Sequence, residues 1–424
     1  MFGKNYEYNW KEGRKMKILL VGGTWTVDPQ VNPEIDRRSS LVDFVYASLK
    51  NYCEKKFGDD FDVEMYNGGC YYNLEMILNK TPEYDIVFWW ANVPDNSLPK
   101  IRNVKEVAPK VMLVSSKRND GDKYSFMELT QRALASKSNL VFEFKKMDRE
   151  IKPGHVEKLF HINVFDPLGC QWFDGWDVSE STHAAMDRLC YLHSMTRQKT
   201  IKSDINKYDV LSRYFDCFKE ESYWSAKITE NPNEDEFINI VRKHAETFYT
   251  IFNPGKDVKR FLGNASLRAP LKIDSTRCMR GMPSFKKDNL VFVSQRNIDK
   301  QFIDIEHFVP CYMEDGKLYY CGDNKPSVDT PIQMRLYEAL PNIRYMIHSH
   351  CYIEDAPFTE KSIPCGAIEE VDEVLSLIDK KWGRDQWLYY INLKGHGSIV
   401  MAKDVEMLNH IRYVGRHLPE AMFE

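Results

Sequence analysis

Short apolar runs alternate with amphipathic segments along the first third of the chain. An apolar run at residues 16–21 is followed at 39–49 by two serines and then by helical periodicity. A serine at a helix start caps a free backbone N–H group, so this segment predicts a helix. Further apolar runs suit buried strands, and they lie at 61–66, 84–91, 110–115 and 139–144. Strands that alternate with helices predict a doubly wound parallel sheet covered on both faces.

The pattern changes after residue 150, where helical segments follow one another before strands return. A polar, turn-rich sequence at 231–235 marks a domain boundary. Helical patterns are expected at 181–195, 204–221, 235–252, 332–340, 367–379 and 405–417. The chain is therefore predicted to comprise an extension (1–15), a Rossmann-like α/β domain (16–200), a helical linker (201–234) and a second α/β domain (235–424).

Two histidines, His348 and His350, end an apolar run in the second domain. Residues two apart on a strand point to the same side, so the two imidazoles aim at one point. His396 lies between two glycines in another apolar pattern, and Asp329 precedes His348 by 19 residues. Three neutral imidazoles and a carboxylate suit zinc or another divalent transition metal, with room for a substrate. The first pair alone would equally suit two hydrogen-bonded histidines near a surface.

These residues belong to an ordered set of motifs that resembles the class II aldolase/adducin superfamily over residues 235–424. The motifs are Gly-Asn-Ala-Ser-Leu-Arg at 263–268, the strand pattern at 287–294, Pro-Ser-Val-Asp at 326–329, His-Ser-His at 348–350 and Gly-His-Gly at 395–397. The resemblance implies an α/β/α domain around an antiparallel sheet. It also implies a divalent metal held by His348, His350 and His396, with zinc expected first and manganese, iron or cobalt as alternatives.

The resemblance further implies a phosphorylated substrate. The family binds phosphate through its Gly-Asn motif, a Thr/Ser-Gly loop and the serines before the acid, which correspond here to Asn264, Arg280, Gly281 and Ser327. Arg280 stands where a small hydroxyl residue is usual. A guanidinium could bind phosphate through bidentate, charge-assisted hydrogen bonds. A solvated turn is the other interpretation of this arginine.

The expected chemistry is a metal-dependent lyase reaction. A metal held by three histidines can bind both oxygens of a hydroxy-ketone and stabilise an enediolate. We expect an aldolase that cleaves a carbon–carbon bond in a phosphorylated ketose or related sugar. A dehydratase or epimerase at the same site, and a non-catalytic adducin-like assembly module, are the alternatives. The three histidines argue against the last, because adducin-like members are expected to lack them.

Three acids are candidates for catalysis. Asp329 stands where the family has a glutamate, and it could ligate the metal or act as a base. The fuculose-phosphate aldolases use a tyrosine after an Ile-Pro segment, but no tyrosine follows residues 363–364 in the corresponding segment here. Glu369 and Glu370 stand near the position of a catalytic glutamate in the related methylthioribulose-phosphate dehydratases. Paired acids at a helix start can also simply stabilise its positive end.

A second ligand site is predicted in the first domain, where the carboxyl ends of parallel strands meet. Gly22, Gly23 and Thr24 follow the first strand, and Asn92 follows the third. Glycines there can expose backbone N–H groups to the phosphate of a nucleotide, or can form a plain turn. Residues 16–145 resemble phosphopantothenoylcysteine synthetase domains, which bind a nucleotide. The resemblance rests on these residues, Asp28 and segments 38–40 and 91–95, the last of which departs at two positions.

Composition narrows the location and partners. The chain has 424 residues, a net charge of −4 and ten cysteines without a Cys-x-x-Cys pair. This charge gives no sign of a nucleic-acid or membrane surface, and no apolar run reaches about 18 residues. Scattered cysteines and a polar N-terminal segment suit a cytoplasmic protein with reduced thiols. The family resemblance adds the expectation of a homotetramer.

Overall fold

The structure is a computed structural model. It describes residues 14–28, 30, 39–93, 104–121, 123–147, 155–167, 170–210, 232–248, 250–252, 259–268 and 290–415. The chain divides into two compact units, of which the first comprises residues 1–194 with 253–256 and the second comprises 195–252 with 257–424. Among the described helices, none combines the length and the hydrophobicity needed to cross a bilayer.

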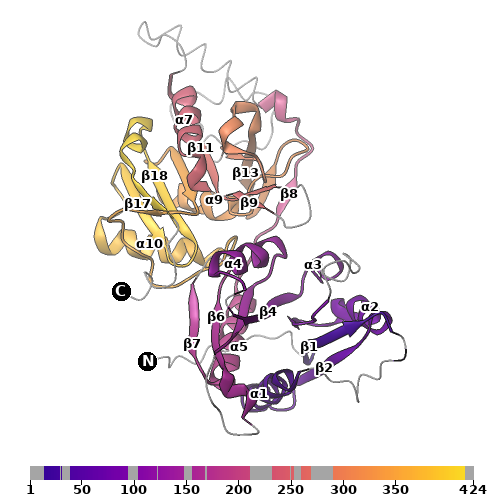
Figure 1. The fold of residues 1–424 in the computed structure, drawn as a ribbon. Helices are drawn as coiled ribbons and strands as arrows, with labels where there is room; N and C mark the ends of the chain where they lie inside the picture. Colours follow the sequence, from indigo (N-terminus) through magenta and orange to yellow (C-terminus); the bar gives the residue numbers. More distant parts are fainter. Residues whose placement is uncertain are drawn as a thin grey trace, which may run out of the picture. The chain divides into compact units, whose positions relative to one another are not determined.

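Parallel strands and covering helices build the first unit (Figure 1). Its strands are β1 (Met16–Thr26), β2 (Phe61–Cys70), β3 (Ile86–Trp89), β4 (Met112–Asp120), β5 (Leu140–Lys146), β6 (Phe160–Phe165) and β7 (Gln171–Gly175). Its helices are α1 (Ser40–Phe57), α2 (Tyr71–Lys80), α3 (Val104–Val107), α4 (Phe126–Ala135) and α5 (Val178–Ser194).

The described strands of this unit form one sheet in the order β2-β1-β3-β4-β5-β6-β7. The first five are mutually parallel, while β6 and β7 add an antiparallel edge. Alternate residues of β1 face opposite cores. Ile18 and Leu20 pack in the core that α1 and α5 cover, and Leu19 and Val21 pack in the core that α2 covers. The predicted doubly wound parallel sheet is therefore confirmed.

A second, mostly antiparallel sheet organises the other unit (Figure 1). Its order is β17-β18-β15-β11-β12-β13-β14-β8, with only the β14–β8 pair parallel. These strands are β8 (Thr200–Lys202), β11 (Asn264–Arg268), β12 (Val291–Ser294), β13 (Phe308–Glu314), β14 (Lys317–Tyr320), β15 (Tyr345–Ser349), β17 (Leu388–Leu393) and β18 (Gly397–Ala402). Two-stranded pairs are formed by β9 (Thr250–Phe252) with β10 (Lys259–Phe261) and by β16 (Tyr352–Ile353) with β19 (Tyr413–Gly415).

Helices cover both faces of this sheet. They are α7 (Pro232–Lys243), α9 (Thr330–Ala339) and α10 (Glu369–Lys381). Tyr345 of β15 packs with Phe237 of α7, at a ring-centroid distance of 4.9 Å. Its neighbour Met346 points into the opposite core, with Leu336 of α9 and Val374 of α10. This layering confirms the predicted α/β/α arrangement.

Two predicted helices are shorter in the structure. The helix expected over 235–252 ends at Lys243, and Thr250–Phe252 form β9 instead. Residues 247–252 read Thr-Phe-Tyr-Thr-Ile-Phe, and β-branched and aromatic side chains favour strands. In the described part of the segment expected as a helix at 405–417, a short 3-10 helix, Val405–His410, is followed by strand β19. Most of the helix expected at 204–221 lies outside the described residues.

Candidate metal centre

The central strand of the second sheet positions the histidines. β15 pairs with β11 on one side and β18 on the other, so that His348 stands opposite Asn264 and Ile399. His350 directly follows the end of β15, and His396 lies in the turn that joins β17 to β18. All three imidazoles are buried, with exposures of 3%, 6% and 3%. Strand pairing therefore brings His396 beside two histidines from a distant part of the sequence.

The three rings converge on one place. Their centroids are separated by 4.6 Å (His348 to His396), 5.0 Å (His348 to His350) and 5.3 Å (His350 to His396). One possible ligand nitrogen from each ring lies within 4.8 Å of the other two. The structure thus contains a buried cluster with the composition of a divalent-metal site.

A backbone carbonyl fixes the state of His348. Its Nδ1 lies 3.0 Å from the carbonyl oxygen of Ser398. A carbonyl can only accept, so Nδ1 carries the hydrogen and Nε2 keeps a free lone pair. Nε2 is buried and has no hydrogen-bond partner among the described residues. A buried lone pair without a hydrogen-bond partner fits a metal ion.

The protonation state of His348 also suits metal binding. Burial and the adjacent His396 lower its pKa from the ordinary value of 6.5 to about 4. The ring is therefore neutral at neutral pH, which is the form that binds a metal.

A carboxylate orients His396. Glu370, in the first turn of α10, is buried and places Oε1 2.7 Å from His396 Nδ1. Burial raises the pKa of Glu370, although the contact with His396 opposes this. A carboxylate that accepts from one ring nitrogen fixes the tautomer and makes the other nitrogen a better metal ligand.

Asp329 lies beside the histidines, at the start of α9. Its Oδ2 accepts a hydrogen bond from Asn264 at 3.0 Å, and its Oδ1 accepts one from the Cys365 thiol at 3.1 Å. The distance from Oδ2 to His348 Nε2 is 3.9 Å. Burial favours the neutral acid, but the neighbouring His348 and His396 and the hydrogen bonds from Cys365 and the Gly366 backbone lower the pKa of Asp329 overall. Asp329 is therefore a charged hydrogen-bond acceptor whose position is fixed by its neighbours.

Of the four predicted phosphate-binding residues, two lie near the histidine cluster and two lie outside the described residues. Asn264 donates to both Asp329 and Ser327, and Ser327 Oγ lies 3.0 Å from its amide nitrogen. Asn264 also accepts from Gln333 and is fully buried. Asn264 and Ser327 therefore adjoin the histidine cluster. Arg280 and Gly281 lie outside the described residues.

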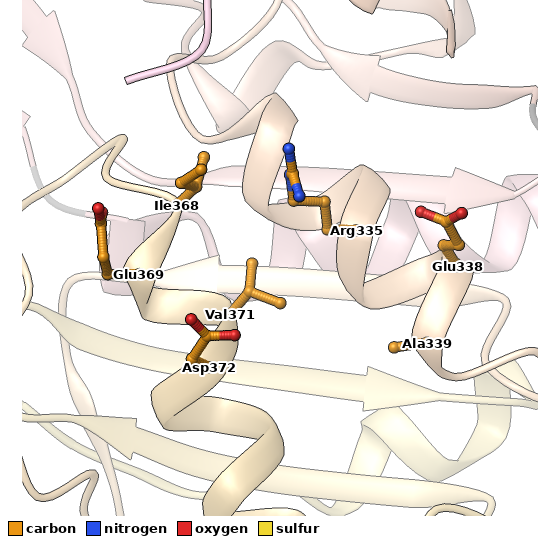
Figure 2. Close-up of a pocket in the computed structure, with 7 residues that line it drawn as sticks. All are labelled: Arg335, Glu338, Ala339, Ile368, Glu369, Val371 and Asp372. Carbon is orange, nitrogen blue, oxygen red and sulfur yellow. The ribbon is translucent and has the colours of Figure 1, made fainter. Parts of the chain in front are cut away.

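Glu369 has different surroundings from Glu370. Its Oε1 accepts a hydrogen bond from the backbone N–H of Thr196 at 2.8 Å. Glu369 also lines a surface cavity between α9 and α10 (Figure 2), and the volume of this cavity is about 330 Å³. The cavity is lined by Arg335, Glu338, Ala339, Ile368, Glu369, Val371 and Asp372. The two adjacent acids thus serve different parts of the domain.

Sequence reasoning missed Cys365 and the Ser398 carbonyl. Cys365 directly follows residues 363–364, the Ile-Pro segment after which the family resemblance places a tyrosine, and this position was its only signal. A backbone carbonyl carries no signal at all, because every residue has one.

Gly22, Gly23 and Thr24 lie within β1 rather than after it. A Cβ atom on Gly22 would lie 2.5 Å from Val42 of α1, so helix packing alone requires this glycine. Asn92 donates its backbone N–H to Gly23 O at 2.8 Å and pairs with Thr24. Gly23, Thr24 and Asn92 are therefore neighbours, and their binding of a nucleotide stays a prediction.

Comparison with known proteins points to the same family for the second unit. Residues 245–356 match the family model described as Class II Aldolase and Adducin N-terminal domain. This match confirms the resemblance and contains Asn264, Asp329, His348 and His350, whereas His396 lies beyond it. No curated protein matches the chain.

Several solved structures resemble parts of the chain. An L-fuculose 1-phosphate aldolase is 15% identical, with 43% of this chain and 82% of that chain covered and a TM-score of 0.28. The L-fuculose-1-phosphate aldolase from Thermus thermophilus is 14% identical, with 41% and 84% covered and a TM-score of 0.25. The DNA/pantothenate metabolism flavoprotein from Streptococcus pneumoniae is 11% identical, with 42% and 100% covered and a TM-score of 0.31.

Proposed function

We propose that the second unit is a metal-dependent lyase that cleaves a carbon–carbon bond in a phosphorylated ketose or a related sugar. The observation that carries this proposal is the convergence of His348, His350 and His396, together with the partners that fix two of their rings. The family match over residues 245–356 supports an enzyme of the class II aldolase type.

The three histidines would hold a divalent ion, and zinc is the ion we propose because imidazole ligands suit it. A bound ion would act as a Lewis acid towards the oxygens of a hydroxy-ketone. The Ser398 carbonyl and Glu370 keep two of the rings in one orientation. Asp329 lies close enough to accept a proton from a substrate bound beside the histidines.

The substrate phosphate is proposed to bind beside Ser327, next to the histidine cluster. Ser327 offers a hydroxyl there, and Asn264 holds that hydroxyl in place at 3.0 Å. Arg280 and Gly281 complete the proposed phosphate site. We assign Glu370 to positioning His396, and catalysis by Glu369 or Glu370 stays a prediction.

A dehydratase or epimerase at the same centre is the second candidate. It is favoured by one observation, namely that a thiol and not a tyrosine hydroxyl follows the Ile-Pro segment and contacts Asp329. Different proton donors can send the same activated sugar along different routes.

A product screen tests these proposals. The zinc-loaded full-length protein is incubated with phosphorylated ketoses, and released aldehyde, lost water and isomerised sugar are measured separately. We expect aldehyde release, abolished in His348→Ala together with bound metal. Water loss or isomerisation alone would favour the second candidate. Purified protein that takes up no divalent metal would instead support a non-catalytic assembly module.

Two further proposals concern the whole chain, which we place in the cytoplasm. We propose a homotetramer, which light scattering at micromolar concentration tests, since a monomer there would exclude it. We also propose a nucleotide ligand near Gly22, Gly23, Thr24 and Asn92. Calorimetric titration of the full-length protein with nucleotides tests this, and no heat at millimolar concentration would leave the first unit as a scaffold.

A further inference from the structure

A thiol lies close to one member of the three-histidine cluster. Cys365 lies in the segment between β16 and α10 and is partly exposed. Its Sγ, an oxygen of Asp329 and a ring nitrogen of His396 all lie within 4.8 Å of one another. His396 belongs to this group and also to the three-histidine group. The sulfur therefore lies close to His396, which is one of the three histidines of the cluster.

Asp329 is held beside the histidines by hydrogen bonds to both of its oxygens. Both of its oxygens already accept hydrogen bonds, one from Asn264 at 3.0 Å and one from Cys365 at 3.1 Å. Asp329 is anchored at the start of a helix and has one methylene fewer than glutamate.

We propose that Cys365 supplies a sulfur ligand to the divalent ion held by His348, His350 and His396. This inference rests on the metal centre proposed above. Sγ gives an electron pair to the ion and loses its proton. Asp329 Oδ1 already accepts that hydrogen, so it takes the proton and passes it to water. No electrons are gained or lost in this exchange.

The fourth ligand changes the properties of the centre. With Cys365 bound, three nitrogens and one sulfur would fill the four positions that zinc prefers. A substrate oxygen must then displace the sulfur or add to it as a fifth ligand. When the sulfur is displaced, the thiolate would take a proton from water, which Asp329 Oδ1 can relay because it contacts the sulfur. A soft thiolate also selects zinc or cobalt over manganese.

The spectrum of the cobalt-loaded protein tests this ligand without measuring turnover. Thiolate bound to Co(II) gives an intense near-ultraviolet charge-transfer band, which imidazole and oxygen ligands do not give. We expect the band at one equivalent of cobalt, its loss in Cys365→Ser, and its retention in the control Cys311→Ala. Cys311 is a buried core thiol of the same unit.

Metal competition gives a second readout. Cys365→Ser is expected to lower zinc affinity more than about tenfold, since even loss of an outer partner costs about 10–100-fold. Manganese affinity should change much less, so the zinc-over-manganese preference falls.

X-ray absorption on the unmutated zinc protein tests the same ligand without a substitution that could disturb folding. One sulfur scatterer at about 2.3 Å is expected. Cobalt bound without the charge-transfer band, or zinc without a sulfur scatterer, would overturn the cysteine ligand and leave the three-histidine centre intact. A protein that binds neither metal would overturn the proposed metal centre itself.

Discussion

Two adjacent acids with different contacts give a matched pair of variants. Glu370 contacts His396 at 2.7 Å, and replacing its carboxylate by an amide in Glu370→Gln weakens the acceptor that fixes this ring. We predict that zinc affinity falls about 10–100-fold, the usual effect of losing an outer partner of a metal ligand. Competition with a chromophoric chelator measures it.

The control is Glu369→Gln, which has the same chemistry one residue away. Glu369 contacts the backbone of Thr196, so we expect zinc affinity within about twofold of the parent protein. Equal losses in both variants would show that the α10 terminus acts as a whole and that Glu370 does not orient His396.

The buried imidazole of His348 predicts a pH dependence of the metal-free protein. Its pKa is about 4 when folded, against an ordinary value of 6.5. Between these values the unfolded chain binds the proton and the folded chain does not, so stability must fall as the pH falls from about 6.5 to 4. The largest loss in the free energy of unfolding from this group is roughly 3 kcal/mol, because the pKa differs by about 2.5 pH units and each unit is worth about 1.36 kcal/mol.

Urea unfolding of the metal-free protein at pH 7 and pH 5 measures this effect. The variant His348→Gln cannot titrate at this position, so its stability should change less between the two pH values. Parallel changes in variant and parent would mean that other groups account for the acid sensitivity.

The residues of the centre differ in how far the sequence predicts them. Residues two apart on a strand share a side, so the joint orientation of His348 and His350 follows from spacing. The sequence cannot tell which of Glu369 and Glu370 contacts His396, because neighbours on a helix point about 100° apart. The rotation of α10 about its axis is set by packing. The contact of Cys365 with Asp329 likewise depends on two segments 36 residues apart.

At the scale of elements, the chain between β10 and β11 passes very close to the backbone of His348 at Gly263. Gly263 has φ +69°, and a Cβ atom there would lie 2.6 Å from the backbone oxygen of His348. A backbone oxygen cannot swing aside as a flexible side chain can. We predict that Gly263→Ala forces β11 and β15 apart, lowers stability by roughly 2–4 kcal/mol and weakens zinc binding.

Gly316→Ala is the matched control. Gly316 has nearly the same φ, +72°, but a Cβ atom there meets nothing within 4 Å. Both variants carry the backbone strain of a left-handed alanine, about 1 kcal/mol, and only Gly263→Ala adds the collision. Chemical denaturation and zinc titration compare them. Equal stability losses and equal zinc affinities would show that the close approach is unimportant.

The elements themselves were largely predictable, because buried strands leave apolar runs of the right length. The apolar runs at 16–21 and 84–91 predict strands in this way, and they fall within or around β1 and β3. Local patterns could not show that β6 and β7 pair antiparallel at the sheet edge, since strand direction depends on the connection. The sequence pattern predicts that the helix continues from Lys243 to residue 252, but the β-branched and aromatic residues Thr250–Phe252 pair with β10 as β9.

At the scale of the whole molecule, each unit has hydrophobic cores of its own. The described residues of the first unit pack around Phe88 and Phe142, and those of the second around Phe292 and Ile347. Units with separate cores can unfold in separate transitions. The proposed metal joins residues of the second unit only, so its binding energy should stabilise that unit alone.

Calorimetric unfolding of the full-length protein tests this consequence of metal binding. An ion that binds only the folded state at 100 times its dissociation constant adds about 2.7 kcal/mol. For a unit of this size we therefore predict that zinc raises one transition by roughly 5–10 °C. The variant His348→Ala should lose this response to zinc. The variant Phe142→Ala, in the first unit, should lower the unfolding temperature of the first unit but leave the response of the second unit to zinc unchanged. If zinc raised both transitions equally, or raised that of His348→Ala as well, its stabilising site could not be the three-histidine cluster.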